Sequence, residues 1–388
     1  MSDWDVLSFS LRLDWQGGVA HTAKSMLCQM ARERKVLNFN PPTGWRTVLR
    51  QPRSHAPRLY RVQDNLWHFE WGYLYPKFYR PPIGVRVTGF AARLCVQYLC
   101  RKLRISAPIY LFWGPFQAEL LPHLPRRFTT YYAYDPFTML QVDRDQWKKD
   151  LLRREQILLD RADVVFAVSQ PLATSLQERG VKEVYVIPNG VDVDALQEAL
   201  GSAEPPDLRV APRPRLAYIG FIREETDLQA FYTIATSRPG WSIVLIGEYH
   251  FVSAEQRQWW DKLTALPNVY YLGKRAYSEI PSYYAGIDVA LVLYRRDTAA
   301  DYISPLKLYE ALGAGLPVIA SRVPDSAHLE NVVYVAANSE QCISLIEAAL
   351  EEQGVGSYQR RILCARQNSW EVRAQSVTNI INRYLLEK

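Results

Sequence analysis

The sequence is poor in the side chains that cross-link a chain or hold a metal ion. It has 5 cysteines and 6 histidines among 388 residues, and no two cysteines have Cys-x-x-Cys spacing. Scattered thiols in odd number indicate a reducing compartment, and they exclude a disulfide framework and a zinc site made of cysteines. The histidines show no ligand spacing, and we identify no acidic metal site. We therefore expect neither a bound metal nor a cofactor.

Long apolar runs are also missing. No stretch reaches the roughly 18 apolar residues that a membrane-spanning helix needs, and the longest candidate, 87–100, is interrupted by Arg93. Residues 1–30 lack a basic start followed by an apolar core, so we expect no signal peptide. With 48% hydrophobic residues the chain is too apolar to be disordered. We expect a cytoplasmic globular protein of two domains, since 388 residues exceed one ordinary core.

The excess of positive charge is confined to the first part of the chain. Residues 12–127 hold 19 Lys+Arg and 5 Asp+Glu, a net charge of +14, whereas residues 201–388 hold 19 and 21, a net charge of −2. Within the basic part, cations of the stretch 86–104 accompany Phe90 and Tyr98. Basic amphipathic surface of this kind suits anionic lipid head groups, so we expect a peripheral protein at the inner face of a membrane.

Two other interpretations of this basic stretch remain. It can be a solvated helix whose apolar side packs on the domain core. It can also bind nucleic acid, but no recognised binding motif accompanies the charge, so we expect no nucleic-acid partner.

Short apolar runs alternate with amphipathic segments along the whole chain, which predicts an α/β fold with largely parallel sheets. In the first half we predict strands over 5–13, 36–40, 107–113, 129–134, 163–168 and 184–187, and helices over 20–34 and 146–161. A proline-rich segment near 200–214 has no periodicity and is interpreted as a linker. Beyond it we predict strands over 216–219, 242–246, 269–272, 289–293 and 317–320, and helices over 307–313 and 371–386.

The segment Asp301–Ser321, DYISPLKLYEALGAGLPVIAS, carries the densest chemistry. Ser304 and Pro305 lead into a helix, whose first N–H groups and dipole suit a phosphate. Lys307 can add a full charge to a diphosphate. Glu310 lies at i+3 on the same side, where a carboxylate can accept both hydroxyls of a ribose. The alternative is an ordinary helix with an i,i+3 salt bridge.

This segment resembles the nucleotide-binding signature of GT-B glycosyltransferases of the family-4-like group. Segments 162–192, 215–222 and 267–292 resemble the same group in the same order. The resemblance implies the GT-B fold, with two Rossmann-like domains and a cleft between them. It implies an acceptor domain over 1–200, a nucleotide-sugar domain over 201–370, and a helix over 371–388 that crosses back to the first domain.

The resemblance also assigns roles to single residues. Glu310 matches the glutamate that holds the donor ribose, and Lys307 matches a lysine on the donor diphosphate. Ser304, Pro305 and Leu306 would line the same pocket. Further donor-binding residues are expected where strands end, namely Gly220, Arg223, Gly247, Glu248, Lys274 and Arg275.

One departure from the family concerns stereochemistry. Family 4 commonly has two glutamates eight apart, and the position of the first is Tyr302, beside Asp301. The SPLKLYE form is more similar to relatives that make teichuronic-type and exopolysaccharide glycans, some of which invert. Retention and inversion both stay open.

In the first half, Asp135 follows an expected strand, where a carboxylate can deprotonate an acceptor hydroxyl. Asp135 can equally cap the turn that precedes Pro136. Trp15, Gly17 and Gly18 form a strand–turn–helix corner that can admit an acceptor, although simple turn geometry explains a Gly-Gly pair nearly as well. His21, in the following helix, is a second candidate base, and a structural role is its alternative.

Taken together, the sequence predicts a metal-independent glycosyltransferase. It would move a sugar from a nucleoside-diphosphate sugar, with UDP or GDP as the nucleotide, to a hydroxyl of a glycan or lipid-linked acceptor. Two alternatives share the fold, an NDP-sugar 2-epimerase and a catalytically silent sugar-nucleotide-binding subunit.

Overall fold

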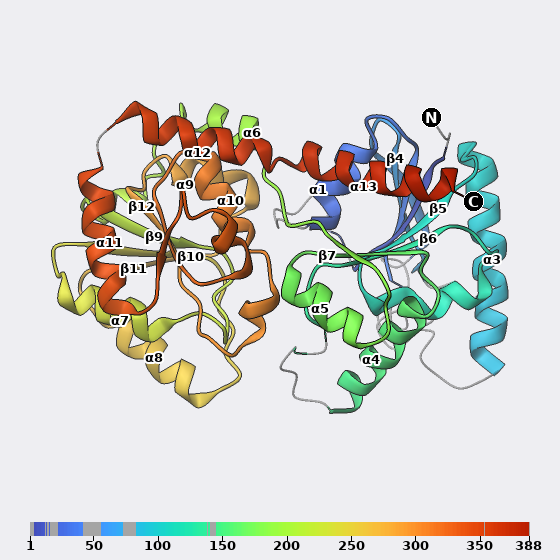
Figure 1. Ribbon diagram of the computed structural model, residues 1–388, viewed down its shortest axis with the longest axis horizontal. Helices are drawn as coiled ribbons and strands as arrows, with labels where there is room; N and C mark the ends of the chain where they lie inside the picture. Colours follow the sequence, from blue (N-terminus) through green and yellow to red (C-terminus); the bar gives the residue numbers. More distant parts are fainter. Residues whose placement is uncertain are drawn as a thin grey trace. The chain divides into compact units, whose positions relative to one another are not determined.

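The computed structural model describes residues 4–11, 13, 15, 22–41, 56–72, 83–137, 139, 145–352 and 354–387. These residues form two compact units (Figure 1). Unit 1 contains the described residues up to Ile187 and those from Ala374 onward, and unit 2 contains Pro188–Arg373.

Unit 1 is built on an eight-stranded sheet with the order β3-β4-β2-β1-β5-β6-β7-β8. Neighbouring strands run parallel except for the antiparallel pair β3–β4. Most central strands are short runs of buried residues, such as VLSF and VVFA, as expected for strands covered on both faces. The strands are β1 (Val6–Phe9), β2 (Val36–Phe39), β3 (Arg58–Gln63), β4 (Leu66–Glu70), β5 (Ile109–Phe112), β6 (Thr129–Ala133), β7 (Val164–Ala167) and β8 (Val184–Val186).

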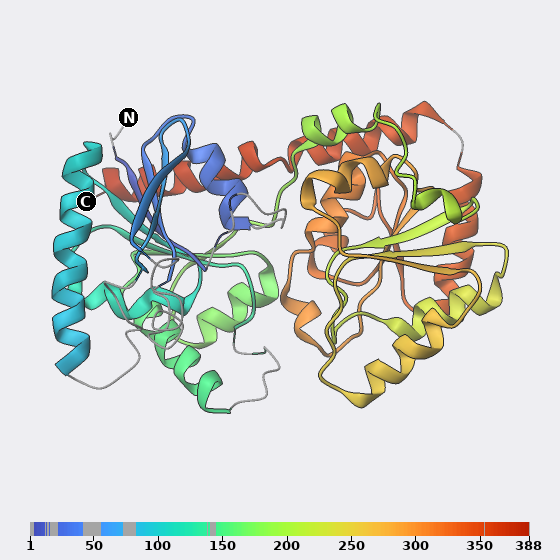
Figure 2. The same ribbon diagram turned by 180° about the vertical axis from the view of Figure 1, so that it is seen from behind.

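The helices of unit 1 cover this sheet, and α3 lies along the outside of the unit in both views (Figure 1 and Figure 2). The helices are α1 (Thr22–Met30), α3 (Ile83–Leu103), α4 (Asp145–Leu159), α5 (Gln170–Glu178) and the 3₁₀ helix η3 (Pro115–His123). Among the described helices, none is both long and apolar enough to span a bilayer.

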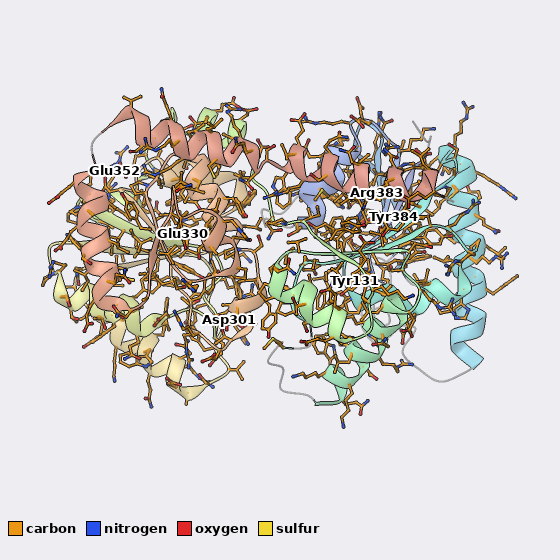
Figure 3. The ribbon with its side chains drawn as sticks, viewed as in Figure 1. Tyr131, Asp301, Glu330, Glu352, Arg383 and Tyr384 are labelled. Carbon is orange, nitrogen blue, oxygen red and sulfur yellow. The ribbon has the colours of Figure 1, made fainter. Side chains whose placement is uncertain are left out.

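The last helix, α13 (Trp370–Leu386), starts in unit 2, and its residues from Ala374 onward belong to unit 1. Figure 3 shows Arg383 and Tyr384 near its end. Both contact Tyr185 in β8: Arg383 donates to its hydroxyl, and the two tyrosine hydroxyls lie 3.1 Å apart. Trp4 Nε1 donates to Asn382 at 2.7 Å, which fixes the same helix near the start of the chain.

Unit 2 has a six-stranded, fully parallel sheet with the order β11-β10-β9-β12-β13-β14. This order reverses between β9 and β12, which is where open α/β sheets bind their ligands. The strands are β9 (Arg215–Ile219), β10 (Ser242–Ile246), β11 (Val269–Gly273), β12 (Val289–Val292), β13 (Val318–Ser321) and β14 (Tyr334–Ala336).

Two apolar clusters, one on each face of the sheet, form the core of unit 2. One cluster involves α6 (Val193–Ala199), α9 (Ile280–Tyr284), α10 (Leu306–Gly313) and α12 (Val355–Gln367). The other involves α7 (Leu228–Ser237), α8 (Ala254–Thr264) and α11 (Ser339–Glu351). The 3₁₀ helices are η4 (Leu208–Val210), η5 (Tyr277–Glu279), η6 (Ala299–Tyr302) and η7 (Pro324–His328).

The prediction of two Rossmann-like parallel sheets is confirmed, but the boundary between them differs from the predicted one. The chain leaves unit 1 at Ile187 rather than near residue 200. The proline-rich segment is part of unit 2, because Leu208 and Ala211 are buried in its core. The composition of this segment resembles a linker, but its two apolar side chains anchor it.

Candidate active site

Two glycines end neighbouring strands of unit 2 in backbone conformations that other residues rarely adopt. Gly220 follows β9 with a φ of +140°, and Gly247 follows β10 with a φ of +147°. A Cβ on Gly247 would lie 1.9 Å from the carbonyl oxygen of Gly220, and a Cβ on Gly220 would lie 2.7 Å from Lys307 Cε. The two turns therefore need glycine, and the side chain of Lys307 fills the space beside Gly220.

Lys307, in the first turn of α10, lies between two tyrosines. Its Nζ lies 3.7 Å from the centre of the Tyr218 ring and 5.2 Å from the centre of the Tyr294 ring. It also donates a hydrogen bond of 3.1 Å to the Tyr294 hydroxyl. No acidic side chain of the described residues forms a salt bridge with Lys307, so ring faces and a hydroxyl stand where a counter-ion would normally be.

Burial and a second cation lower the pKa of Lys307. Loss of solvent is the larger cause, the interaction with Tyr218 opposes it, and the charge of Arg223 adds to it. Arg223 is exposed in the loop after β9, with its guanidinium 5.2 Å from the ring centre of Phe221. Two like charges without a shared anion repel each other, so this region is electrostatically prepared for a negatively charged ligand.

Glu310 lies one turn further along α10 and is 7% exposed. Tyr277 donates to its Oε1 at 2.7 Å, and Tyr284 donates to its Oε2 at 3.3 Å. Burial raises the pKa of Glu310, while the two hydroxyls and Lys307 lower it. Lys307 and Glu310 have separate partners and form no ion pair, so the alternative of an i,i+3 salt bridge is wrong.

Ser304, Pro305 and Leu306 lie at the start of α10, and their expected place in the donor pocket stays a prediction. Pro305 is the N-cap residue and Leu306 begins the helix, so their backbone borders the helix start. Ser304 is buried, and its hydroxyl is already used: it accepts from Asn189 N at 2.9 Å and donates to Asp325 at 2.5 Å. A donor contact of this hydroxyl stays a prediction.

Lys274 and Arg275, which were expected near the nucleobase, form side-chain contacts with other residues of unit 2. Lys274 pairs with Glu248 at 2.9 Å, and both side chains are exposed. Arg275 forms an ion pair with Asp207 and donates to the Tyr283 hydroxyl at 2.7 Å. These contacts raise the pKa of Arg275. The side chain of Arg275 is thereby directed to the segment before η4, which leaves the backbone after β11 as the part that can meet a base.

In unit 1, Asp135 is half-buried two residues after β6, at the carboxyl end of the sheet. Its backbone carbonyl accepts from Phe137 N at 2.9 Å. Trp15 is half-buried, and its indole Nε1 donates to Nδ1 of the buried His68 at 2.7 Å. Gly17, Gly18 and His21, the other acceptor-side candidates, lie outside the described residues.

Sequence reasoning missed the side chains that surround the two charged groups. Tyr218 and Tyr294 border Lys307, and Tyr277 and Tyr284 bind Glu310. The available signal was the position of Tyr294 directly after the predicted strand 289–293. In the described part of the chain, no three His, Cys, Asp or Glu side chains gather as they would around a metal ion.

Two family matches cover about three quarters of the chain. Residues 45–195 match the family described as Glycosyltransferase Family 4, and residues 213–352 match the one described as Glycosyl transferases group 1. TuaH of Bacillus subtilis strain 168, named for a glycosyltransferase role in teichuronic acid biosynthesis, is 25% identical over 231 residues. That match spans 58% of this chain and 57% of TuaH, so just over half of the relative's length is compared.

Solved structures agree in fold over nearly the whole chain. Sucrose-phosphate synthase of Thermosynechococcus elongatus has a TM-score of 0.67 at 16% identity, covering 99% of this chain and 100% of its own. HepE of Anabaena, solved with UDP and glucose, has a TM-score of 0.63 at 17% identity, covering 97% and 99%. The trehalose 6-phosphate synthase of Burkholderia multivorans has a TM-score of 0.66 at 14% identity, covering 99% of each chain. The chain therefore combines a glycosyltransferase family 4 domain over 45–195 with a group 1 glycosyltransferase domain over 213–352, and it has the GT-B fold over nearly its whole length.

Proposed function

We propose that this enzyme transfers a sugar from a UDP- or GDP-sugar, held by unit 2, to a hydroxyl of a glycan or lipid-linked acceptor bound by unit 1. The observation that carries the proposal is Lys307, a partly buried cation without an acidic partner at the start of α10. The bound UDP of HepE supports a nucleotide donor for this fold.

The diphosphate leaving group is the chemical reason for this placement. When the bond between the anomeric carbon and the diphosphate oxygen breaks, negative charge grows on the diphosphate. Lys307 and the first N–H groups of α10 meet that charge in a partly buried site, where each contact counts for more than in water. The exposed Arg223 adds an attraction that solvent weakens. Because these groups supply the positive charge, we propose a transfer that needs no metal ion.

Glu310 would hold the donor ribose. Each carboxylate oxygen has two lone pairs, and one on each already accepts from a tyrosine hydroxyl. The remaining lone pairs can accept the two ribose hydroxyls. The tyrosines then act as supports that fix the plane of the carboxylate before the donor arrives, which lowers the entropic cost of binding.

Asp135 is the proposed base on the acceptor side. As the new bond forms between the acceptor oxygen and the anomeric carbon, the hydroxyl proton passes to the Asp135 carboxylate, and the diphosphate leaves with the bonding electrons. This assignment corresponds to an inverting transfer. Trp15, Gly17, Gly18 and His21 are proposed to border the acceptor.

Donor binding and turnover test these roles together. Calorimetric titration with UDP- and GDP-sugars should identify a donor, and Lys307→Ala should weaken its binding about a hundredfold, corresponding to about 3 kcal/mol for a desolvated charge-assisted contact. Asp135→Asn should bind the donor normally and release little nucleotide. Lys262→Ala, an exposed lysine on α8, is the control.

The outcomes separate this proposal from the two alternatives. An epimerised free sugar nucleotide without an acceptor product would indicate an epimerase, and tight binding without any turnover would indicate a silent subunit. Equal turnover in the wild type, Lys307→Ala and Asp135→Asn would refute the site. Full activity after treatment with EDTA is expected, and loss of activity that Mg²⁺ or Mn²⁺ restores would refute metal independence.

The second part of the proposal concerns an anionic membrane, and its evidence is the outer face of α3. Phe90, Leu94 and Tyr98, spaced at i, i+4 and i+8, are 61%, 50% and 61% exposed. Arg93, Arg101 and Lys102 on the same helix are exposed too, while Ala92, Val96 and Leu99 are buried against unit 1. Residues 83–103 contain no acidic side chain.

This face fits the boundary between head groups and acyl chains. A merely solvated helix has no use for three large exposed apolar side chains, whereas an interfacial helix inserts them beside anionic lipids and pairs its cations with the head groups. We therefore propose peripheral binding of unit 1 to an anionic leaflet. Such a surface would bring the enzyme to a lipid-linked acceptor.

Flotation with vesicles tests the membrane part. The wild type should float with vesicles of phosphatidylcholine and phosphatidylglycerol and stay behind with phosphatidylcholine alone. Phe90→Ser combined with Tyr98→Ser should lose flotation. Val355→Ser with Leu363→Ser is the matched control, because these apolar side chains on α12 are 70% and 59% exposed. Equal flotation of both double variants would refute the role of α3.

A further inference from the structure

A buried polar cluster lies immediately before α10, and its central carboxylate is not among the groups that are proposed to contact the donor. At its centre is Asp325, in η7, which is 4% exposed and accepts from the Ser304 hydroxyl at 2.5 Å. Ser304 Oγ accepts in turn from Asn189 N at 2.9 Å, and Asn189 Nδ2 donates to the Ser304 carbonyl at 2.6 Å. Three segments far apart in the sequence are thus joined by side chains.

A cation completes this cluster. Arg373 Nε donates to the Asn189 carbonyl at 3.3 Å, and its guanidinium lies 5.9 Å from the ring centre of Tyr309, on α10. The positive charge of Arg373 and hydrogen bonds from Ser304 and Tyr309 lower the pKa of Asp325, but burial outweighs them and raises it to about 6. The carboxylate is therefore retained at an energetic cost, which a purely structural position would avoid with an apolar side chain.

The cluster lies where the chain passes between the two units. Within the described residues these passages are Ile187 to Pro188 and Arg373 to Ala374. Asn189 is one residue from the first passage, and Arg373 forms the second. The segments at these two passages also pair with each other. Val191 forms an isolated parallel β-bridge with Ser369, and its carbonyl accepts from Trp370 N at 3.2 Å.

The same cluster borders the helix that carries the donor-binding groups. Ser304 precedes the N-cap residue Pro305, Lys307 follows in the first turn, and Glu310 in the next. Because α10 is a rigid element, a change in the position of Ser304 moves Lys307 and Glu310 with it. Two hydrogen bonds join Asn189 to Ser304, so the same change in the position of Ser304 also moves the chain at Ile187–Pro188.

We propose that Asp325 is a positioning residue that acts through Ser304, holding the start of α10 against the two segments by which the chain passes between its units. In this role it aligns Lys307 and Glu310 for the donor and links donor occupancy to those passages. The inference rests on the proposed donor site and adds a residue that no sequence motif indicated.

Nucleotide affinity and amide hydrogen exchange test the link in the full-length protein. Asp325→Ala should weaken UDP binding about tenfold, since it removes a hydrogen bond to a charged acceptor, and Ser304→Ala should do the same. Asp325→Asn keeps an acceptor oxygen for Ser304 and should restore most of the affinity. Exchange in the Ala variant should rise at 189–191 and 368–373 as well as beside η7.

Asp288→Ala is the matched control, because Asp288 accepts from Arg215 N at 2.7 Å and pairs with Arg213, away from α10. It should lower stability but leave UDP affinity within about twofold. If Asp325→Ala lowers stability as Asp288→Ala does and binds UDP like the wild type, the positioning role is refuted. If the wild type binds no nucleotide, the proposed function fails separately. Unchanged exchange at 189–191 in ligand-free Asp325→Ala would still overturn the link.

Discussion

The two units use positive charge in opposite ways. On α3 of unit 1, Arg101 and Lys102 are exposed and stand beside exposed apolar side chains. In unit 2, Lys307 is partly buried between Tyr218 and Tyr294, and it packs against Gly220, which has no side chain. The overall charge of +6 hides this difference, since residues 188–373 of unit 2 hold 17 Lys+Arg and 23 Asp+Glu, a net charge of −6.

The difference matters because the strength of a charge depends on its surroundings. Exposed cations act through water and salt, so they suit a diffuse partner such as a lipid surface. A partly buried cation acts through a medium of lower dielectric, so it suits one ligand in one position. The comparison therefore predicts that changes inside unit 2 have large and local effects, whereas changes on α3 have graded effects that depend on conditions.

The largest effect is expected where the backbones of Gly247 and Gly220 approach each other in unit 2. Gly247→Ala should lower the free energy of unfolding by about 3 kcal/mol or more, because its Cβ would meet the Gly220 carbonyl and its φ is strained for alanine. Urea denaturation measures this. Gly240→Ala is the control, since a Cβ there meets nothing within 4 Å. Equal loss in both variants would show that the Gly220–Gly247 contact is unimportant.

Much of this unit could be predicted from the sequence because its signals are local. Lys307 and Glu310 lie three residues apart on one helix, and the strands before Gly220 and Gly247 are short apolar runs that end at glycine. Propensity and spacing are sufficient for such features. The tyrosines that hold these charges come from strands and helices distant in sequence, and only the packed sheet brings them together.

Unit 1 was harder to predict for the same physical reason. The pair β3–β4 was missed, because β3 has only partly buried and exposed residues and so lacks a buried apolar run. In unit 2, Asp325 gave no signal either: it follows β13 in a short 3₁₀ helix, and it accepts from Ser304, which in turn accepts from Asn189, 115 residues earlier in the sequence. Buried polar contacts between distant segments cannot be read from periodicity.

The second prediction uses the buried carboxylate of unit 2. Burial raises the pKa of Asp325 from an ordinary 3.8 to about 6, despite Ser304, Tyr309, Arg373 and His328. The folded state therefore holds a proton that the unfolded state releases between these pH values, and this contribution to stability is lost as the pH rises through 6. Asparagine does not titrate, so Asp325→Asn avoids this loss. The free energy of unfolding of the variant, relative to that of the wild type, should therefore be up to about 3 kcal/mol higher at pH 8 than at pH 4.

Urea denaturation at several pH values measures this gain. Asp288→Asn is the control, because Asp288 is partly exposed and pairs with Arg213, so its difference from the wild type should not rise in the same window. Parallel stability curves for the wild type and Asp325→Asn would show that Asp325 does not titrate as a buried group.

The smallest and most graded effect concerns the exposed cations of unit 1. Raising the ionic strength from about 0.05 M to about 0.5 M should weaken binding to anionic vesicles about tenfold, because the screening length falls below the distance between α3 and the head groups. UDP binding should change less than about threefold, since Lys307 is shielded from the added salt. Arg101→Gln with Lys102→Gln should flatten the salt dependence of vesicle binding. Arg360→Gln with Arg366→Gln, which removes two exposed cations from α12, should not. Equal salt dependence of vesicle and UDP binding would contradict the difference that we draw between the exposed cations of α3 and the partly buried Lys307.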